Sequence, residues 1–182
     1  MRVVATEYLS LDGVFEEPGR WSGPFFNDEA AQFKLRELQA SDALLLGRKT
    51  YEGFAAAWPS MTDEAGFADK MNSMPKYVVS STLDRVDWPG SRLVTGDVAE
   101  EVRKLQQEPG QDLLLSGSGQ LFTAMKQANL IDLYRFMVHP IVLGKGKRLF
   151  AEGVDEKVLA LTHTETFGSG IIILEYAPTE RS

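Results

Sequence analysis

The hydrophobic pattern of this chain alternates between short apolar runs and longer amphipathic segments. The runs at 2–9, 42–46 and 113–116 predict strands, and the continuous apolar character of 42–46 indicates a strand buried on both faces. This alternation is typical of an α/β protein. We therefore expect a largely parallel sheet with helices on both of its faces.

The clearest helical segment is 28–40, where Ala31, Leu35 and Leu38 repeat at helical spacing. Its start offers two possible caps, Asn27-Asp28. Periodicity and turn residues place the other elements in the same way. They are helices at 50–57, 98–107 and 120–128, a polar loop with a helix at 61–74, and strands at 76–80, 92–95, 133–140, 158–166 and 170–176.

Two features complete the predicted organisation. The last two runs flank Gly168-Ser169-Gly170 and predict a C-terminal antiparallel hairpin. The stretch 14–27 is rich in Gly, Pro and aromatic residues, which is typical of an ordered loop that covers a ligand. No linker, repeat or low-complexity tract interrupts the chain, so we expect one domain, 1–182.

Composition and charge exclude several classes of function. The net charge of -7 disfavours a nucleic-acid surface, which needs clustered Lys and Arg. Cysteine is absent and the histidines are only His139 and His163, so we expect neither thiolate chemistry nor a metal site. No signal sequence and no apolar run of about 20 residues is present, so we expect a cytoplasmic protein with no membrane partner.

Two apolar runs end in glycine turns that lead directly into predicted helices. The run 43–46 enters Gly47-Arg48-Lys49-Thr50, and the run 113–116 enters Gly117-Ser118-Gly119. A helix N-terminus behind a glycine turn presents free backbone N–H groups that suit a phosphate. Two such units favour a nucleotide that is held through a diphosphate, with Arg48 and Lys49 beside an extra phosphate.

Both turns also have an ordinary explanation, because most strands need a glycine to turn. Gly117 to Phe122 begins like a Rossmann fingerprint, but Phe122 stands where the third small residue belongs. The loop Gly144-Lys145-Gly146-Lys147 lacks the pattern of a Walker loop and is predicted to be a basic surface loop. Several sites together still favour binding, since Ser80-Ser81 adds hydroxyl groups at a third strand end.

Two acids are candidate catalytic residues. Glu29 opens the first helix and faces the aromatic loop, where a pocket can raise its pKa and make it a proton donor. A capping role favoured by the helix dipole is the alternative for Glu29. Asp12 is the second candidate, and an Asx-turn is its alternative. Trp21 and the neighbouring Phe25-Phe26 either stack on a planar ring or form a small apolar cluster.

The residues resemble a known family. Ala43 to Glu52 is similar to the strand, Gly-Arg-Lys-Thr turn and helix start of dihydrofolate reductases, and Ser80-Ser81 resembles their adenosine-side serines. Leu130 to Phe150 and Ser10 to Gly13 are closer to the reductase domain of the riboflavin-biosynthesis deaminase–reductase. The resemblance implies NADPH as hydride donor and a three-layer α/β/α dihydrofolate-reductase-like fold with a mostly parallel mixed sheet. The implied cofactor-binding residues are Trp21, Gly47, Arg48, Lys49, Thr50, Ser80, Ser81, Gly117, Ser118, Gly119, Gln120 and Leu121.

Departures from the family bear on the substrate. Val14 stands where riboflavin reductases tend to have a basic residue, and Ser116 where they tend to have Glu. In dihydrofolate reductases the substrate-binding acid lies four residues before a Phe-Lys pair, and Phe33-Lys34 puts Glu29 there. The expected substrate is a pyrimidine or pterin-like heterocycle. A nucleotide-binding protein without catalysis is the alternative.

The last apolar run suggests an oligomer. Ile171 to Leu174 is longer than an exposed edge strand should be, and riboflavin-type relatives are dimers. We therefore expect a homodimer that covers this edge. The alternative is that the run is an internal strand between its own neighbours.

Overall fold

The computed structural model describes residues 1–150 and 156–179 of the chain. An eight-stranded sheet has the order β4-β3-β2-β5-β1-β6-β8-β7. Its strands are β1 (Arg2–Ser10), β2 (Ser41–Gly47), β3 (Lys76–Val79), β4 (Ser91–Val94), β5 (Asp112–Ser116), β6 (Leu133–His139), β7 (Leu159–Thr166) and β8 (Ile172–Pro178). The helices are α1 (Asp28–Gln39), α2 (Arg48–Ala57), α3 (Phe67–Ser73), α4 (Val98–Gln107) and α5 (Gly119–Gln127), with short 3-10 turns at Pro18–Arg20, Gly23–Phe25 and Trp58–Ser60.

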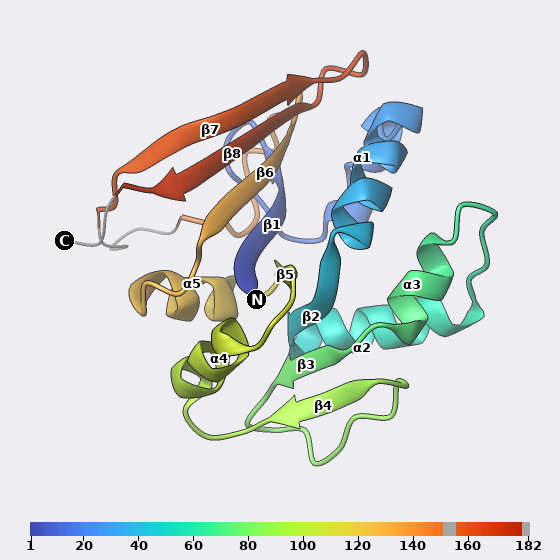
Figure 1. Ribbon diagram of the computed structural model, residues 1–182. Helices are drawn as coiled ribbons and strands as arrows, with labels where there is room; N and C mark the ends of the chain where they lie inside the picture. Colours follow the sequence, from blue (N-terminus) through green and yellow to red (C-terminus); the bar gives the residue numbers. More distant parts are fainter. Residues whose placement is uncertain (151–155, 180–182) are drawn as a thin grey trace.

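The predicted three-layer arrangement is confirmed. Strands β4, β3, β2, β5, β1 and β6 run parallel, and the β7–β8 hairpin adds two antiparallel strands beside β6. Helices α4 and α5 pack on one face of the sheet, while α1, α2 and α3 pack on the other (Figure 1). The two apolar clusters meet at the central strands, where Val3 and Ala5 face one layer and Val4 faces the other.

Helix α1 departs in part from the predicted periodicity. Its cap is Asn27, whose side chain accepts a hydrogen bond from the Ala30 amide, as predicted. The buried face, however, consists of Ala30, Phe33, Glu37 and Leu38, while Ala31 is exposed. Only Leu38 of the three predicted core positions is fully buried, because Glu37 takes an inward position where cations compensate its charge.

The edge-strand argument for a dimer is wrong. Strand β8 contains most of the Ile171 to Leu174 run and lies between β6 and β7, so this run is internal. Ile171 and Ile173 have no exposed surface. The free edge on this side is β7, whose residues are mostly exposed. Any pairing at this edge therefore involves β7.

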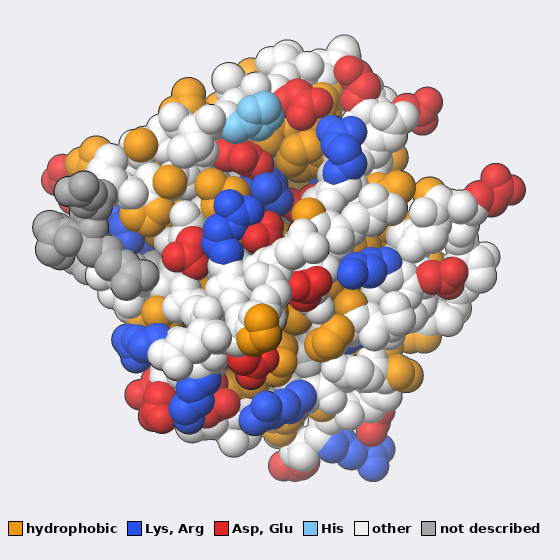
Figure 2. Space-filling model, in the orientation of Figure 1, with side chains coloured by type: hydrophobic (Ala, Val, Ile, Leu, Met, Phe, Trp, Pro, Cys, Tyr) orange, Lys and Arg blue, Asp and Glu red, His pale blue; other side chains and the backbone are white. Residues whose placement is uncertain are grey.

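The surface carries charged side chains of both signs (Figure 2). On the face drawn in Figure 2, Lys and Arg side chains are interspersed with Asp and Glu instead of forming a broad basic surface. Within residues 1–150 and 156–179, no helix is both long and apolar enough to cross a membrane. The same residues contain no group of three or more His, Asp or Glu side chains that could hold a metal ion.

Candidate functional site

The two glycine turns lie against each other. Strands β2 and β5 are neighbours, with Leu46 opposite Ser116, so both turns leave the sheet at the same level. A Cβ atom added to Gly47 would lie 2.2 Å from the Ser118 hydroxyl, and one added to Gly117 would lie 2.6 Å from the Thr50 hydroxyl. Gly117 also has a φ of 63°, which favours glycine. The two glycines therefore leave room for the Ser118 and Thr50 side chains, and the turns pack against each other.

A cleft opens in front of these turns. Its volume is about 1340 Å³, more than the roughly 300–1,000 Å³ of a typical small-molecule site, so it has room for a dinucleotide and a second ligand. Helix α2 begins at the first turn and α5 at the second, so two helix N-termini meet at this end. The predicted residues that line the cleft are Arg48, Lys49, Thr50, Gly117, Ser118, Gly119 and Gln120.

Five basic residues line the cleft in a protein that is acidic overall. Arg48 and Lys49 begin α2, Lys147 and Arg148 come from the loop after β6, and Lys34 comes from α1. Arg48 makes one long ion pair, 3.8 Å to Glu52, and its side chain is 46% exposed. Such an exposed pair is weak, so it competes little with a ligand for the Arg48 guanidinium. With the amides at the helix N-termini, these cations favour an anion.

Ser80 and Ser81, which the resemblance assigns to the adenosine side of the cofactor, follow directly after β3 and do not line the cleft. Gly47 pairs with Val79, so Ser80 follows directly beside the first glycine turn. The Ser80 hydroxyl accepts hydrogen bonds from the amides of Thr82 and Leu83, while Ser81 is exposed. Their binding role stays a prediction, because neither lines the cleft.

The aromatic loop reaches the cleft through Phe15. A Cβ atom on Gly119 would lie 2.5 Å from the Phe15 ring, so this ring lies directly on the second glycine turn. Trp21 is buried away from the cleft, where its indole N–H donates to the Glu16 carbonyl and its ring meets His139 edge-on at 5.2 Å. Leu121 belongs to the core on the α5 side. For these two residues the predicted cofactor contact has no geometric support.

The predicted catalytic acids lie outside the cleft lining. Glu29 is exposed and accepts hydrogen bonds from the Gly168 amide at 2.7 Å and the Asn27 amide group at 3.0 Å. It therefore ties α1 to the β7–β8 turn. Asp12 accepts from the amides of Leu143 and Gly144, and these bonds hold the pKa of its carboxyl down at about 2. Asp12 fastens a loop, and its low pKa makes it a poor proton donor.

The acids that line the cleft are Glu7, Glu16, Glu17 and Glu37, and the one with an unpartnered buried oxygen is Glu7, which the motif analysis missed. It is 4% exposed and follows the last β1–β5 pair, Thr6 with Ser116. Burial raises the pKa of Glu7 to about 8, although the Lys34 ammonium and the Gly117 N–H oppose the shift. Its Oε1 atom has no hydrogen-bond partner among the described residues. A single Glu within the apolar run 2–9 was the available signal.

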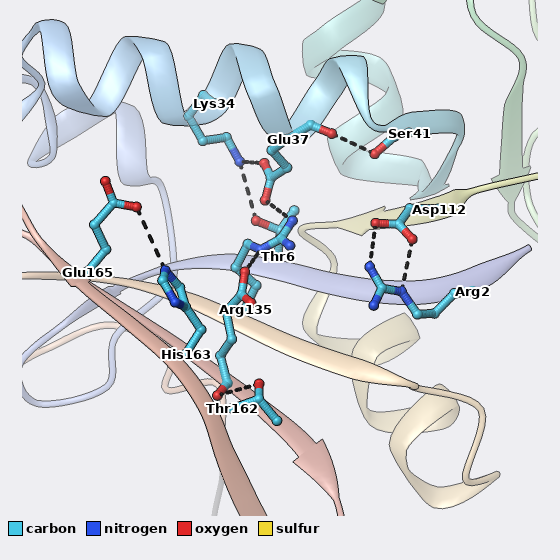
Figure 3. A network of polar contacts seen from close by, with 11 residues as sticks. Arg2, Thr6, Lys34, Glu37, Ser41, Asp112, Arg135, Thr162, His163 and Glu165 are labelled. Carbon is cyan, nitrogen blue, oxygen red and sulfur yellow. Dashed lines mark hydrogen bonds and ion pairs between the residues drawn. The ribbon is translucent and has the colours of Figure 1, made fainter.

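A polar network lies under α1 at the same cleft. Lys34 and Glu37 form an ion pair, Lys34 also donates to the Thr6 hydroxyl at 3.3 Å, and Arg135 on β6 donates to Glu37 at 3.2 Å. Figure 3 shows both α1 side chains directed at Thr6 and Arg135 on the sheet. Arg135 also pairs with Glu175 on β8. The network thus links α1 to three strands.

Comparisons with known proteins identify the family. The model of the RibD C-terminal domain matches residues 2–173. Two relatives come from Bacillus subtilis (strain 168): the uncharacterized protein YyaP is 33% identical over 142 residues, covering 76% of this chain and 75% of that protein. The uncharacterized protein YwjB is 28% identical, covering 73% and 72%.

Solved structures share the fold. A Shewanella sp. PV-4 protein named for riboflavin biosynthesis has a TM-score of 0.78 at 20% identity, covering 99% of this chain and all of that one. Enterococcus faecalis dihydrofolate reductase complexed with NADP(H) has a TM-score of 0.67 at 16% identity, covering 98% and 97%. A Thermotoga maritima deaminase/reductase has a TM-score of 0.66 at 16% identity, and the chain spans 56% of it. The chain belongs to the RibD C-terminal domain family.

Proposed function

We propose that this member of the RibD C-terminal domain family is an NADPH-dependent reductase acting on a small pyrimidine or pterin-like heterocycle. The observation that carries the proposal is the contact between the two glycine turns at the head of the cleft. The absence of a Cβ atom at Gly47 and at Gly117 lets the Ser118 and Thr50 side chains fit between the turns, so that the two turns pack together. This backbone cradle, with two helix N-termini behind it, fits the diphosphate of a dinucleotide.

The residues divide into groups by the part of the cofactor they would hold. Gly47 and Gly117 to Gly119 would bind the diphosphate through their backbone, while Arg48 and Lys49 would bind the adenosine phosphate with help from Ser80-Ser81. NADPH supplies a hydride when it is bound, and the protein orients the two ligands and excludes water. The remaining cleft volume, on the α1 side, would hold the heterocycle.

Calorimetric titration of NADPH and NADH tests the phosphate assignment. NADPH should bind more tightly, and Arg48→Ala should weaken it by about 1–3 kcal/mol, the range for charge-assisted hydrogen bonds, while changing NADH little. Arg103→Ala is the matched control, because Arg103 is exposed on α4, on the opposite face of the sheet from α2. Equal or absent binding of the two nucleotides contradicts the assignment.

A second candidate function is nucleotide binding without catalysis. Val14 and Ser116 favour it, since both replace residues that the resemblance ties to the substrate of riboflavin reductases. A screen of pteridines, folates and pyrimidinones for NADPH oxidation separates the two functions. Turnover of any one above background removes the binding-only alternative.

The proposal includes a homodimer. The exposed edge strand β7 supports it, because an unpaired edge of eight residues is available to a second copy. Sedimentation at micromolar concentration measures the oligomeric state of the protein. A monomer mass over the whole accessible concentration range contradicts this part of the proposal.

A further inference from the structure

The charged side chains beneath α1 form ion pairs: Glu37 is paired with Lys34 and Arg135, and Glu175 is paired with Arg135. The Glu37 side chain is 1% exposed, with one oxygen bonded to Lys34 and the other to Arg135. Burial alone would raise the pKa of Glu37, but these two cations hold it below its ordinary value. Arg135 shares its guanidinium with Glu175 at 2.5 Å. Each Glu37 oxygen therefore already accepts a bond from a cation.

Lys34 is the more exposed group of its ion pair. Its side chain is 15% exposed, against 1% for Glu37, and both residues line the cleft. An ammonium has three N–H donors, and Glu37 and the Thr6 hydroxyl take two of them. Burial lowers the pKa of Lys34, but Glu37 and Tyr8 more than offset this, so the group stays protonated. One N–H of a cation is thus left for an acceptor in the cleft.

One wall of the cleft that Lys34 lines suits a flat ring. Phe54, Trp58 and Phe67 line the same cleft and pack on the α1 side of the sheet. The Trp58 ring lies 5.2 Å from that of Phe67 and 6.4 Å from that of Phe54. Aromatic side chains of this kind contribute apolar area and ring contacts to a planar ligand.

We propose that Lys34 is a specificity residue for the substrate. It selects a flat heterocycle that presents an acceptor oxygen, either of a ring carbonyl or of a carboxylate. A heterocycle that presents the N–H donors of a 2-aminopyrimidine is disfavoured. This assignment rests on the proposed function for the location of the substrate. A donor group placed against the ammonium leaves both unpaired, which is strongly discriminating in a buried site. An aminopyrimidine needs a carboxylate instead, but burial raises the pKa of Glu7 to about 8, and each Glu37 oxygen already accepts a bond from a cation. Glu16 and Glu17 at the cleft are paired with Lys147 and Arg20, and Glu29 lies outside the cleft lining.

The test compares two probes on the full chain without cofactor. Orotate carries ring carbonyls and a carboxylate, and 2,4-diaminopyrimidine carries amino donors; ligand-observed NMR titration gives a Kd for each. The wild-type protein should bind orotate at least about tenfold more tightly, since each such factor corresponds to about 1.4 kcal/mol. Lys34→Met should remove this preference, and Lys34→Arg should keep it.

Lys34→Met leaves Glu37 with one partner fewer and can destabilise the fold. The double variant Lys34→Met/Glu37→Gln removes both charges of the pair, so its thermal midpoint should lie closer to that of the wild type while the preference is still absent. Lys104→Met is the matched control, because Lys104 is 58% exposed on α4, away from this cleft. It should keep the preference.

Three results overturn the assignment: no binding of orotate to the wild-type protein, equal or tighter binding of 2,4-diaminopyrimidine, or a preference that survives in the double variant. The NADPH titration distinguishes this failure from failure of the proposed function. Absent NADPH binding with an intact probe preference refutes the reductase, whereas normal NADPH binding without the preference refutes the role of Lys34.

Discussion

Replacement of Glu7 by Gln should stabilise the protein at alkaline pH. In the unfolded chain this carboxyl ionises near its ordinary pKa of 4.5, but burial raises its pKa in the fold to about 8. Between these values the folded protein keeps a proton that the unfolded chain has lost. Because the folded state binds more protons, the free energy of unfolding falls as the pH rises through this window.

The magnitude follows from the two pKa values. The slope is about 1.4 kcal/mol per pH unit, so ionisable Glu7 costs the fold about 4–5 kcal/mol above pH 8 and nothing below pH 4.5. That figure is an upper limit, since water entering the cleft beside Glu7 would reduce it. The amide that Glu7→Gln introduces cannot ionise and has nearly the same volume as the carboxyl. The two proteins should therefore have similar stabilities at pH 4.5, and the Glu7→Gln advantage should grow to about 2–4 kcal/mol by pH 8.5.

Urea unfolding at pH 5, 6.5, 8 and 8.5 measures this difference directly, with equal m values as the check on two-state behaviour. Glu108→Gln provides the control, because its exposed side chain should give a difference that is flat with pH. A Glu7→Gln difference that is also flat, or a variant that loses stability relative to wild type as the pH rises, would refute the reasoning.

Two smaller predictions concern the turns and the loop that border the cleft. Gly117→Ala places a Cβ atom 2.6 Å from the Thr50 hydroxyl at a φ of 63°, so it should lower stability by about 1–2 kcal/mol and weaken NADPH, as urea unfolding and calorimetry can measure; unchanged values of both would contradict the contact. Asp12→Ala removes the acceptor for the Leu143 and Gly144 amides, so proteolysis within loop 141–148 should become faster; an unchanged cleavage rate would contradict the fastening role.

Most elements and both glycine turns could be predicted from the sequence, because they depend on local pattern. Helix α4 occupies 98–107 as predicted, and the strand boundaries differ by one or two residues. Helix α2 begins at Arg48 instead of Thr50, since Gly47 itself is the cap. The contact between the turns could not be predicted with the same means. It requires β2 and β5, which are far apart in the chain, to be neighbours.

Glu29 shows why a motif match along a helix does not by itself place an acid in the cleft lining. The Phe33-Lys34 pair fixed its location along α1, but the start of this helix extends towards the β7–β8 turn. Glu29 lies two helical turns before Glu37, the acid that faces the sheet. Sequence spacing gives the position along a helix, while the depth of each turn in the molecule depends on how the helix packs.

Glu7 and Glu37 were both missed because the pattern predicts no buried acid at either position; Glu37 lies off the predicted apolar face of its helix. Glu7 interrupts a buried strand run, and Glu37 precedes Leu38 on the inward face of α1. Burying a carboxyl is costly, so it must be compensated by partners or by a shifted pKa. Glu37 is compensated by two cations and becomes structural, whereas Glu7 retains an unpartnered oxygen and a pKa near 8. A charged residue within a predicted strand run, such as Glu7, therefore indicates a site more directly here than the motif did, and the partners of a buried acid decide whether it is structural or functional.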